Sequence, residues 1–199
     1  MSKVRLAVVG CGARGKGHIS TLIDLEDVEL SALCDQDEGL CNTIGDEFGV
    51  KRRYGNVDEM LDIESPDGVV VAVPAHLNGK IALPILERGV NTLVEKPPGM
   101  SVSETKILRD TAARTGAKVM VGWQRRFHPI VVKARELIEA RGPVTQIVGE
   151  FHKSITRLEK SGRFPKELMD NMLFETPIHA IDLVRAIAGS VGIVETHSV

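Results

Sequence analysis

Short apolar runs rich in valine, isoleucine and leucine alternate with amphipathic stretches along the first 122 residues. The apolar runs predict strands, and the stretches between them predict helices. Near-continuous valine runs are typical of strands that are buried on both faces of a parallel sheet. Strands and helices that alternate with short, right-handed connections predict a doubly wound α/β sheet. The predicted strands are 4–9, 28–34, 51–54, 69–73, 91–94 and 118–121, and the predicted helices are 16–25, 38–48, 57–61, 78–87 and 103–114.

The pattern changes after Trp123. Helices are predicted over 130–140 and 178–188, and alternating apolar and polar residues predict strands over 145–153 and 193–199. We therefore expect a dinucleotide-binding Rossmann domain over residues 1–122. Residues 123–199 are expected to form the first part of an α+β domain with a mainly antiparallel sheet. Since two strands do not make a stable sheet, we expect this second domain to be incomplete and the chain to be a truncated product or fragment that associates when isolated.

Composition excludes several classes of partner. The 199 residues carry 25 basic and 27 acidic side chains that are well interleaved, so no basic stripe indicates nucleic acid. No apolar run reaches the length of a membrane span, and the first residues do not have the architecture of a signal peptide. Three cysteines are too few for a disulfide framework, and six dispersed histidines show no metal-ligand spacing. A cytoplasmic protein without a bound metal is expected.

A glycine motif follows the first predicted strand and opens the first predicted helix. It reads Gly10-Cys11-Gly12-Ala13-Arg14-Gly15, a G-x-G-x-x-G sequence. In this context Gly10 permits a tight turn, Gly12 lets the backbone approach a pyrophosphate, and Gly15 lets the helix pack close to the strand. The helix N-terminus then offers N–H groups to the phosphates. The alternative is a glycine-rich turn that binds no ligand. Under the first interpretation the cofactor-binding residues here are Gly10, Gly12, Ala13, Arg14 and Gly15.

Asp35 follows the second predicted strand, where a carboxylate can accept hydrogen bonds from ribose hydroxyls. A carboxylate there repels the 2′-phosphate of NADP, and the next residues include no Arg or Lys that reverses this. The sequence therefore predicts NAD as the cofactor ahead of NADP. The alternative is that Asp35 caps the following helix, a role that Asp37 could also fill.

Further motifs narrow the interpretation. They are GCGARG with His18 shortly after it, VAVPAHLN after the fourth strand, VEKP at Glu95-Lys96-Pro97, GWQRRFHP, and FETPIHAIDLV. In their order and spacing the chain resembles the glucose–fructose oxidoreductase / inositol dehydrogenase / rhizopine-catabolism (Gfo/Idh/MocA) family. The resemblance runs through the whole chain, and it implies an NAD(P)-dependent oxidoreductase that acts on a sugar, inositol or related polyol.

The resemblance also implies roles for individual residues. Lys96 corresponds to the lysine that lies at the nicotinamide and the substrate hydroxyl, and Glu95 to a residue that often contacts the nicotinamide ribose. His179 corresponds to the proton-transfer histidine. The chain departs from the family pattern where Glu175 replaces an aspartate and where Asn78 replaces a frequent histidine. Val73 and His76 are expected to contact the cofactor, and Trp123, Arg125 and Glu175 the substrate.

Oxidation of an alcohol requires loss of a hydride to the nicotinamide and of a proton to a base. An imidazole, with an unperturbed pKa of about 6.5, makes His179 a suitable base, and Lys96 would stabilise the developing alkoxide or take the proton itself. Glu175, His179 and Asp182 have the spacing of one helical face. Each residue also has a plainer interpretation. His179 could be a histidine whose hydrogen bonds are satisfied within the protein, and Lys96 could simply end a strand. Trp123 could belong to the core, and Arg125 and Arg126 could form surface ion pairs.

Two other functions remain open within this resemblance. One is a non-catalytic, cofactor-sensing regulator, against which the presence of Lys96 and His179 argues. The other is an NAD-dependent glycosidase, which uses the same hydride step transiently. The sequence does not identify the substrate. For the dehydrogenase and for the glycosidase, the substrate would be a small molecule. A full-length protein of this family is expected to form a homo-oligomer.

Overall fold

The computed structural model describes residues 2–152, 154–162, 165–175, 177–189 and 192–195. The chain forms two compact units, which we call unit 1 (residues 1–122) and unit 2 (residues 123–199). Among the described residues, no helix is both long and apolar enough to span a bilayer.

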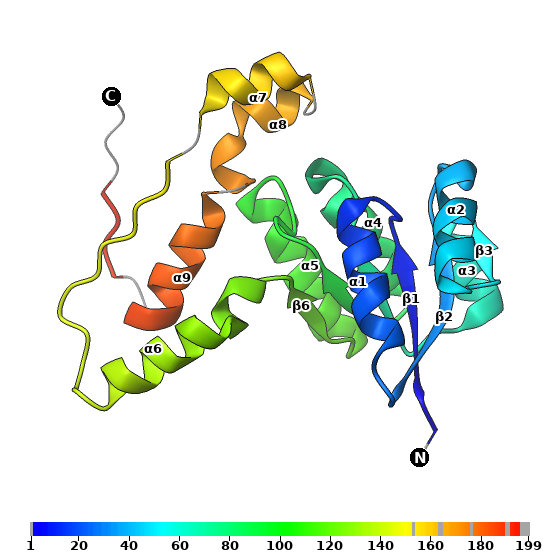
Figure 1. The fold of residues 1–199 in the computed structure, drawn as a ribbon, viewed down its shortest axis with the longest axis horizontal. Coiled ribbons are helices and arrows are strands. Elements are labelled where there is room, and N and C mark those ends of the chain that lie inside the picture. The colour runs from blue at the N-terminus through cyan, green and yellow to red at the C-terminus, as the bar shows by residue number, and fades with distance from the viewer. Residues whose placement is uncertain (1, 153, 163–164, 176, 190–191, 196–199) are drawn as a thin grey trace. The chain divides into compact units, whose positions relative to one another are not determined.

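Unit 1 contains a parallel sheet of six strands (Figure 1). The strand order is β3-β2-β1-β4-β5-β6, which is the order of a doubly wound dinucleotide-binding sheet. This confirms the predicted Rossmann architecture, and each strand differs from its predicted range by at most two residues at either end. The strands are β1 (Val4–Val9), β2 (Val28–Cys34), β3 (Arg53–Tyr54), β4 (Gly68–Val71), β5 (Asn91–Val94) and β6 (Val119–Val121).

Helices cover both faces of this sheet. The alternating direction of side chains along a strand divides the core into two clusters. Ala7, Val9 and Val71 belong to the cluster that also contains residues of α3, α4 and α5, whereas Val8 and Val70 belong to the cluster with α1 and α2. The helices are α1 (Ala13–Ile23), α2 (Glu38–Phe48), α3 (Val57–Glu64), η1 (Ala75–Leu77), α4 (Asn78–Glu87) and α5 (Val102–Thr115).

Helix boundaries follow local chemistry. Asp37 caps α2, since its side chain accepts a hydrogen bond from the backbone N–H of Leu40. The helix ends at Gly49, whose φ of 72° suits a residue without a Cβ. Helix α1 begins at Ala13, three residues before its predicted start, because Gly12 is already its N-cap. The glycine turn therefore passes directly into the helix.

All three cysteines lie buried in unit 1 as free thiols. Burial is the main cause that raises the pKa of Cys11, and it also raises the pKa of Cys34 to about 12. The thiols of Cys11 and Cys34 are therefore protonated at neutral pH and fill space as small apolar groups, as we expected.

Unit 2 is helical in its described residues. Its elements are η2 (Gln124–Phe127), α6 (Pro129–Glu139), α7 (Ile155–Ser161), α8 (Lys166–Asp170), η3 (Met172–Phe174) and α9 (Ile178–Ala188). The predicted helices 130–140 and 178–188 are confirmed. Helices α7 and α8 were not predicted; both are short and lie in a polar stretch.

The predicted strand over 145–153 is wrong for residues 145–152, which have no regular secondary structure. A strand is stabilised by hydrogen bonds to a neighbouring strand, and all strands among the described residues lie in unit 1. Residues 193–195 of the other predicted strand are likewise irregular, and 196–199 lie outside the described residues. The antiparallel sheet of a second domain stays a prediction.

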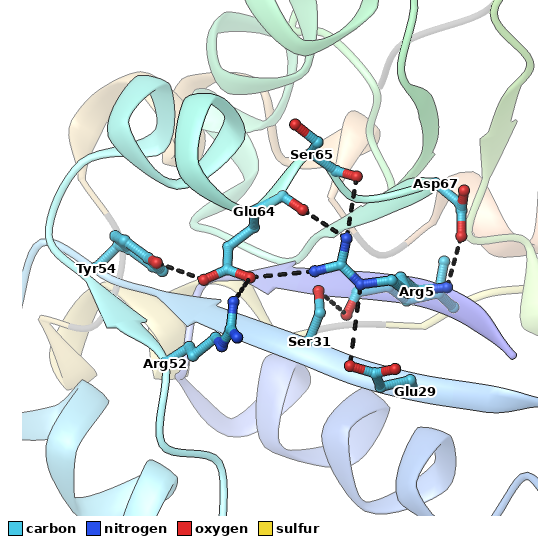
Figure 2. A network of polar contacts seen from close by, with 9 residues as sticks. Arg5, Glu29, Ser31, Arg52, Tyr54, Glu64, Ser65 and Asp67 are labelled. Carbon is cyan, nitrogen blue, oxygen red and sulfur yellow. Dashed lines mark hydrogen bonds and ion pairs between the residues drawn. The ribbon is translucent and has the colours of Figure 1, made fainter.

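A buried carboxylate joins three segments of unit 1 (Figure 2). The side chain of Glu64, at the end of α3, is completely buried. It accepts hydrogen bonds from Arg5 of β1 at 3.2 Å, from Arg52 at 2.7 Å and from the Tyr54 hydroxyl of β3. Burial raises the pKa of Glu64, but these hydrogen bonds and the charges of Arg52 and Arg5 outweigh it and hold the pKa below its ordinary value.

We predict that Glu64→Gln destabilises the protein by about 1–3 kcal/mol at pH 7, because it leaves charged donors without their partner. A lowered folded-state pKa contributes stability above the unfolded pKa of about 4.3 and loses it as the pH falls through the lower folded value. Urea unfolding should therefore show a difference between wild type and Glu64→Gln that is constant above about pH 5 and shrinks below about pH 4.

The matched control is Glu29→Gln. Glu29 is also near Arg5, with 3.9 Å between Glu29 Oε1 and Arg5 Nε, but its side chain is exposed. It should change the free energy of unfolding by less than about 0.5 kcal/mol. A difference for Glu64→Gln that does not depend on pH would contradict an ionised Glu64.

Candidate functional site

The glycine turn has the geometry that its sequence predicts. Gly10 has a φ of 97°, and a Cβ there would lie 2.5 Å from the carbonyl oxygen of Ala72. A Cβ on Gly15 would lie only 1.7 Å from the carbonyl oxygen of Gly10. Both positions therefore exclude a side chain, the first at the turn and the second where α1 packs on β1.

The space beside Gly12 is open. A Cβ built on Gly12 meets no atom of the described residues within 4 Å, and Gly12 is exposed. Gly12 is also the N-cap of α1, and it offers no side chain that would bond the first N–H groups of the helix. Exposed Ala13 and Arg14 follow. An anion can thus approach the uncapped end of α1 directly, so this turn suits a dinucleotide pyrophosphate.

Asp35 lies just after β2 and contacts the glycine turn. One carboxylate oxygen accepts a hydrogen bond from the backbone N–H of Cys11 at 2.7 Å, and the other accepts one from the N–H of Asp37 at 2.9 Å. Because Asp37 caps α2, Asp35 is not needed for that role. A carboxylate has about four acceptor positions, so Asp35 can still accept ribose hydroxyls.

Glu95 and Lys96 follow β5 at the carboxyl edge of the sheet. Both residues are buried, with exposed fractions of 6% and 8%. His18 Nε2, from the second turn of α1, lies 2.9 Å from Glu95 Oε1. The other oxygen, Oε2, is buried without a hydrogen-bond partner among the described residues. That oxygen is an acceptor for a donor group of a ligand.

Positive charges act on Glu95. Burial raises the pKa of this carboxyl, but the hydrogen bond from His18 and the charges of His18, Arg14 and Lys96 outweigh burial and hold the pKa below its ordinary value. Glu95 is therefore an anion at neutral pH. A buried anion can accept a hydrogen bond from a ligand but cannot donate one.

The predicted cofactor residues after β4 lie near the same edge. Val73 is half-buried and packs against the core cluster of α3, α4 and α5. His76 lies in η1, and its Nδ1 is buried without a partner in the described part of the chain. Strand β4 lies between β1 and β5, so these residues stand between the glycine turn and the Glu95 loop.

Unit 2 brings together a second group of predicted residues. His179, in the first turn of α9, is 2% exposed. The Trp123 ring meets its imidazole edge-on, with ring centroids 6.1 Å apart. Arg126, from η2, forms a two-pronged ion pair with buried Asp182 of α9, in which Nε lies 2.8 Å from Oδ2. Tryptophan and arginine thus fix α9, and His179 with it, against η2.

A further prediction in unit 2 is wrong. Glu175 does not share a helical face with His179 and Asp182, because it is the C-cap residue that follows η3, and α9 begins only at Ile178. Pro177 explains the break, since it has no N–H and is accommodated at a helix start. Arg125 is exposed, and its role and that of Glu175 in substrate binding stay predictions.

Three residues make contacts, within unit 1 or within unit 2, that we did not predict from the sequence. His18 bonds Glu95, Asn78 bonds the Glu95–Pro97 loop, and Arg126 pairs with Asp182. His18 and Asn78 stood out in the sequence only as a family marker and as a departure from the family. The partner of each lies far away along the chain, so spacing carried no signal for it.

Residues 4–123 match a family described as an oxidoreductase family with an NAD-binding Rossmann fold, the Gfo/Idh/MocA family. The match covers more than half of the chain. The chain belongs to this family. The resemblance inferred from the sequence motifs is thereby confirmed, and with it the NAD-binding character of the Rossmann fold.

Relatives within this family differ in substrate and cofactor. The chain is 27% identical over 192 residues to scyllo-inositol 2-dehydrogenase (NAD(+)) of Bacillus subtilis, covering 94% of this chain and 55% of that protein. It is 24% identical over 184 residues to D-xylose 1-dehydrogenase (NADP(+)) 2 of Haloferax volcanii, covering 92% and 57%. The chain thus spans just over half the length of each of these two curated relatives.

One solved structure with a similar fold contains bound NAD. The chain is similar to GenD2 from gentamicin A biosynthesis in complex with NAD, with a TM-score of 0.78 and 27% identity. The likeness covers 95% of this chain and 54% of GenD2. The uncapped end of α1, the open space at Gly12 and the unpartnered oxygen of Glu95 are all compatible with NAD in this chain.

We predict that Gly15→Ala lowers NAD affinity by at least about tenfold and destabilises the protein by about 1–3 kcal/mol. The added Cβ overlaps the Gly10 carbonyl and forces α1 away from the turn. Calorimetric titration with NAD and thermal unfolding measure the two effects.

The control is Gly17→Ala in the same helix, where a Cβ meets nothing within 4 Å. Alanine has the higher helix propensity, so Gly17→Ala should stabilise the protein by about 0.5–1 kcal/mol and leave NAD affinity unchanged. Equal NAD affinities for the two variants would show that the close approach of α1 to β1 does not matter for binding.

Proposed function

We propose that this chain carries the cofactor site and part of the catalytic machinery of an NAD-dependent dehydrogenase that oxidises a secondary alcohol of a sugar, inositol or related polyol. The observation that carries the proposal is the buried Glu95-Lys96 pair at the carboxyl edge of β5. It is linked through His18 to the helix that follows the glycine turn. Ligands of open α/β sheets bind at this edge.

The residues of unit 1 would divide into three tasks. Gly10, Gly12 and Gly15, with Ala13 and Arg14, would hold the pyrophosphate. Asp35 would hold the adenosine ribose, and Val73, His76 and Glu95 the nicotinamide half. Bound NAD would supply the hydride acceptor.

Lys96 and His179 would handle the proton of the alcohol. Lys96 Nζ would donate a hydrogen bond to the reacting oxygen and stabilise negative charge as it develops there. His179 would accept the proton at a ring nitrogen, and Trp123 and Arg126 would hold the imidazole in place through their contacts in unit 2. That Lys96 and His179 act on one oxygen stays a prediction. Trp123, Arg125 and Glu175 remain the candidate substrate contacts.

The names of relatives support the substrate class without choosing a substrate. Inositol and xylose are both polyhydroxylated, and the two enzymes named above use different nicotinamide cofactors. The preference for NAD in this chain is supported by Asp35 and by the acidic residues that follow it, Asp37 and Glu38. A carboxylate repels the additional phosphate of NADP.

The proposed activity is tested by NADH formation from NAD with a panel of inositols and sugars. We expect Lys96→Met and His179→Asn each to lower the rate by about 10²- to 10⁴-fold, the usual effect of removing a group that transfers or stabilises a proton. Since the chain spans just over half the length of its relatives, the comparison between variants carries the test rather than the absolute rate.

The control is Lys80→Gln, an exposed lysine of α4 outside the site, which should leave the rate unchanged. NAD binding without NADH formation on any substrate would favour the non-catalytic sensor. Cleavage of a glycoside without net NADH would favour the glycosidase.

Cofactor preference is tested at Asp35. Because its carboxylate also holds the Cys11 N–H, we choose Asp35→Asn, which can keep that acceptor while it removes the charge. Combined with Gln36→Arg, it should shift the ratio of NAD to NADP affinity toward NADP by about tenfold or more, measured by calorimetry. Gln36→Arg alone is the matched variant and should shift the ratio less. Tighter binding of NADP than NAD by the wild-type chain would contradict the assignment.

A further inference from the structure

Asn78 connects the start of α4 to the loop that contains Lys96. Its side chain is completely buried. The amide nitrogen Nδ2 donates hydrogen bonds to the carbonyl oxygens of Glu95 and Pro97, each at 3.0 Å. Both partners are carbonyl oxygens and can only accept, so the nitrogen of the amide must face them.

The two bonded carbonyls lie on either side of Lys96. A single amide therefore fixes the residues immediately before and after the lysine. The next residue of the helix adds to this restraint, since a Cβ on Gly79 would lie 2.8 Å from the carbonyl oxygen of Pro98. Helix α4 thus begins in close contact with the loop and leaves it little freedom to move.

Helix capping does not explain an asparagine here. Asn78 is the first residue of α4, and the N-cap is Leu77, whose side chain makes no capping hydrogen bond. The amide oxygen of Asn78 is buried without a partner among the described residues, which costs about 1–3 kcal/mol. The two hydrogen bonds that Nδ2 donates are therefore the contribution of the buried amide that offsets the cost of its unpaired oxygen.

We propose that Asn78 is a positioning residue that fixes the Glu95–Pro97 backbone, so that the Glu95 carboxylate and Lys96 Nζ are presented to the nicotinamide end of the dinucleotide. This inference rests on the proposed function. It assigns to α4 a role in the reaction centre, although α4 supplies no group that touches the reacting atoms.

A purely structural role for Asn78 makes a different prediction. If the Asn78 hydrogen bonds only stabilise unit 1, their loss should lower the affinity for every ligand of the Rossmann fold by the same factor. A residue that positions the Lys96 loop affects only ligands that reach that loop. NAD and ADP-ribose separate the two cases, because both contain the adenosine and pyrophosphate groups that the glycine turn and Asp35 would bind, and only NAD contains the nicotinamide.

The experiment measures calorimetric affinities of NAD and ADP-ribose for the wild-type chain, Asn78→Leu and Asn78→Ser, with thermal unfolding in parallel. Leucine has a similar size and removes both donors, whereas serine keeps a single donor and is the smaller disturbance. Lys80→Gln on the same helix is the control. We expect Asn78→Leu to lower NAD affinity by about tenfold and ADP-ribose affinity by less than about twofold. Asn78→Ser should lie between Asn78→Leu and wild type.

The failures are distinguishable. If the wild-type chain binds neither ligand, the proposed function is wrong and the inference falls with it. If the wild-type chain binds NAD and ADP-ribose equally, or if the variants lower both affinities by the same factor or change neither, the inference alone is overturned. Loss of folding in both variants would overturn it in favour of a purely structural tie.

Discussion

The close approach of α1 to β1 is the constraint on which the rest of the site depends. The helix can lie against the strand only because Gly15 carries no side chain where it meets the Gly10 carbonyl. This contact aims the uncapped N-terminus of α1 at the turn. It also places His18, one turn further along, within reach of Glu95, which follows a strand two positions away in the sheet. A single packing distance thereby sets both the phosphate end and the nicotinamide end of the proposed site.

Most of unit 1 could be predicted from the sequence, because its strands are buried on both faces and read as apolar runs. Helices α2 and α4 and strands β2 and β5 begin and end at the predicted residues. The start of α1 was missed because a helix can begin within a glycine motif when Gly12 takes extended dihedral angles. Boundaries of this kind depend on backbone geometry, which hydrophobic periodicity does not report.

Unit 2 was harder to predict for a different physical reason. An alternating pattern over 145–153 indicates which side chains could be covered in a strand, but a strand forms only where another edge supplies hydrogen bonds. Helix α9 was predicted correctly because its apolar periodicity is local. The ion pair between Arg126 and Asp182 was not predicted. The sequence placed Asp182 on the helical face of His179 and indicated only an unspecified surface ion pair for Arg126. Glu175 was placed on the same helical face as His179 because of its spacing in the sequence. Pro177, the N-cap of α9, separates Glu175 from that helix.

The hydrogen bond between His18 and Glu95 has a consequence for how such a site can change over generations. Glu95 is nearly buried, and its ion-pair partner comes from a distant part of the chain. Loss of the histidine alone would leave a buried anion with fewer compensating groups, and loss of the glutamate alone would remove the hydrogen-bond partner of the His18 imidazole. We therefore expect positions 18 and 95 to tolerate substitution together more readily than singly. A lineage that replaces one of them is expected to pass through a poorly tolerated intermediate unless the other changes with it.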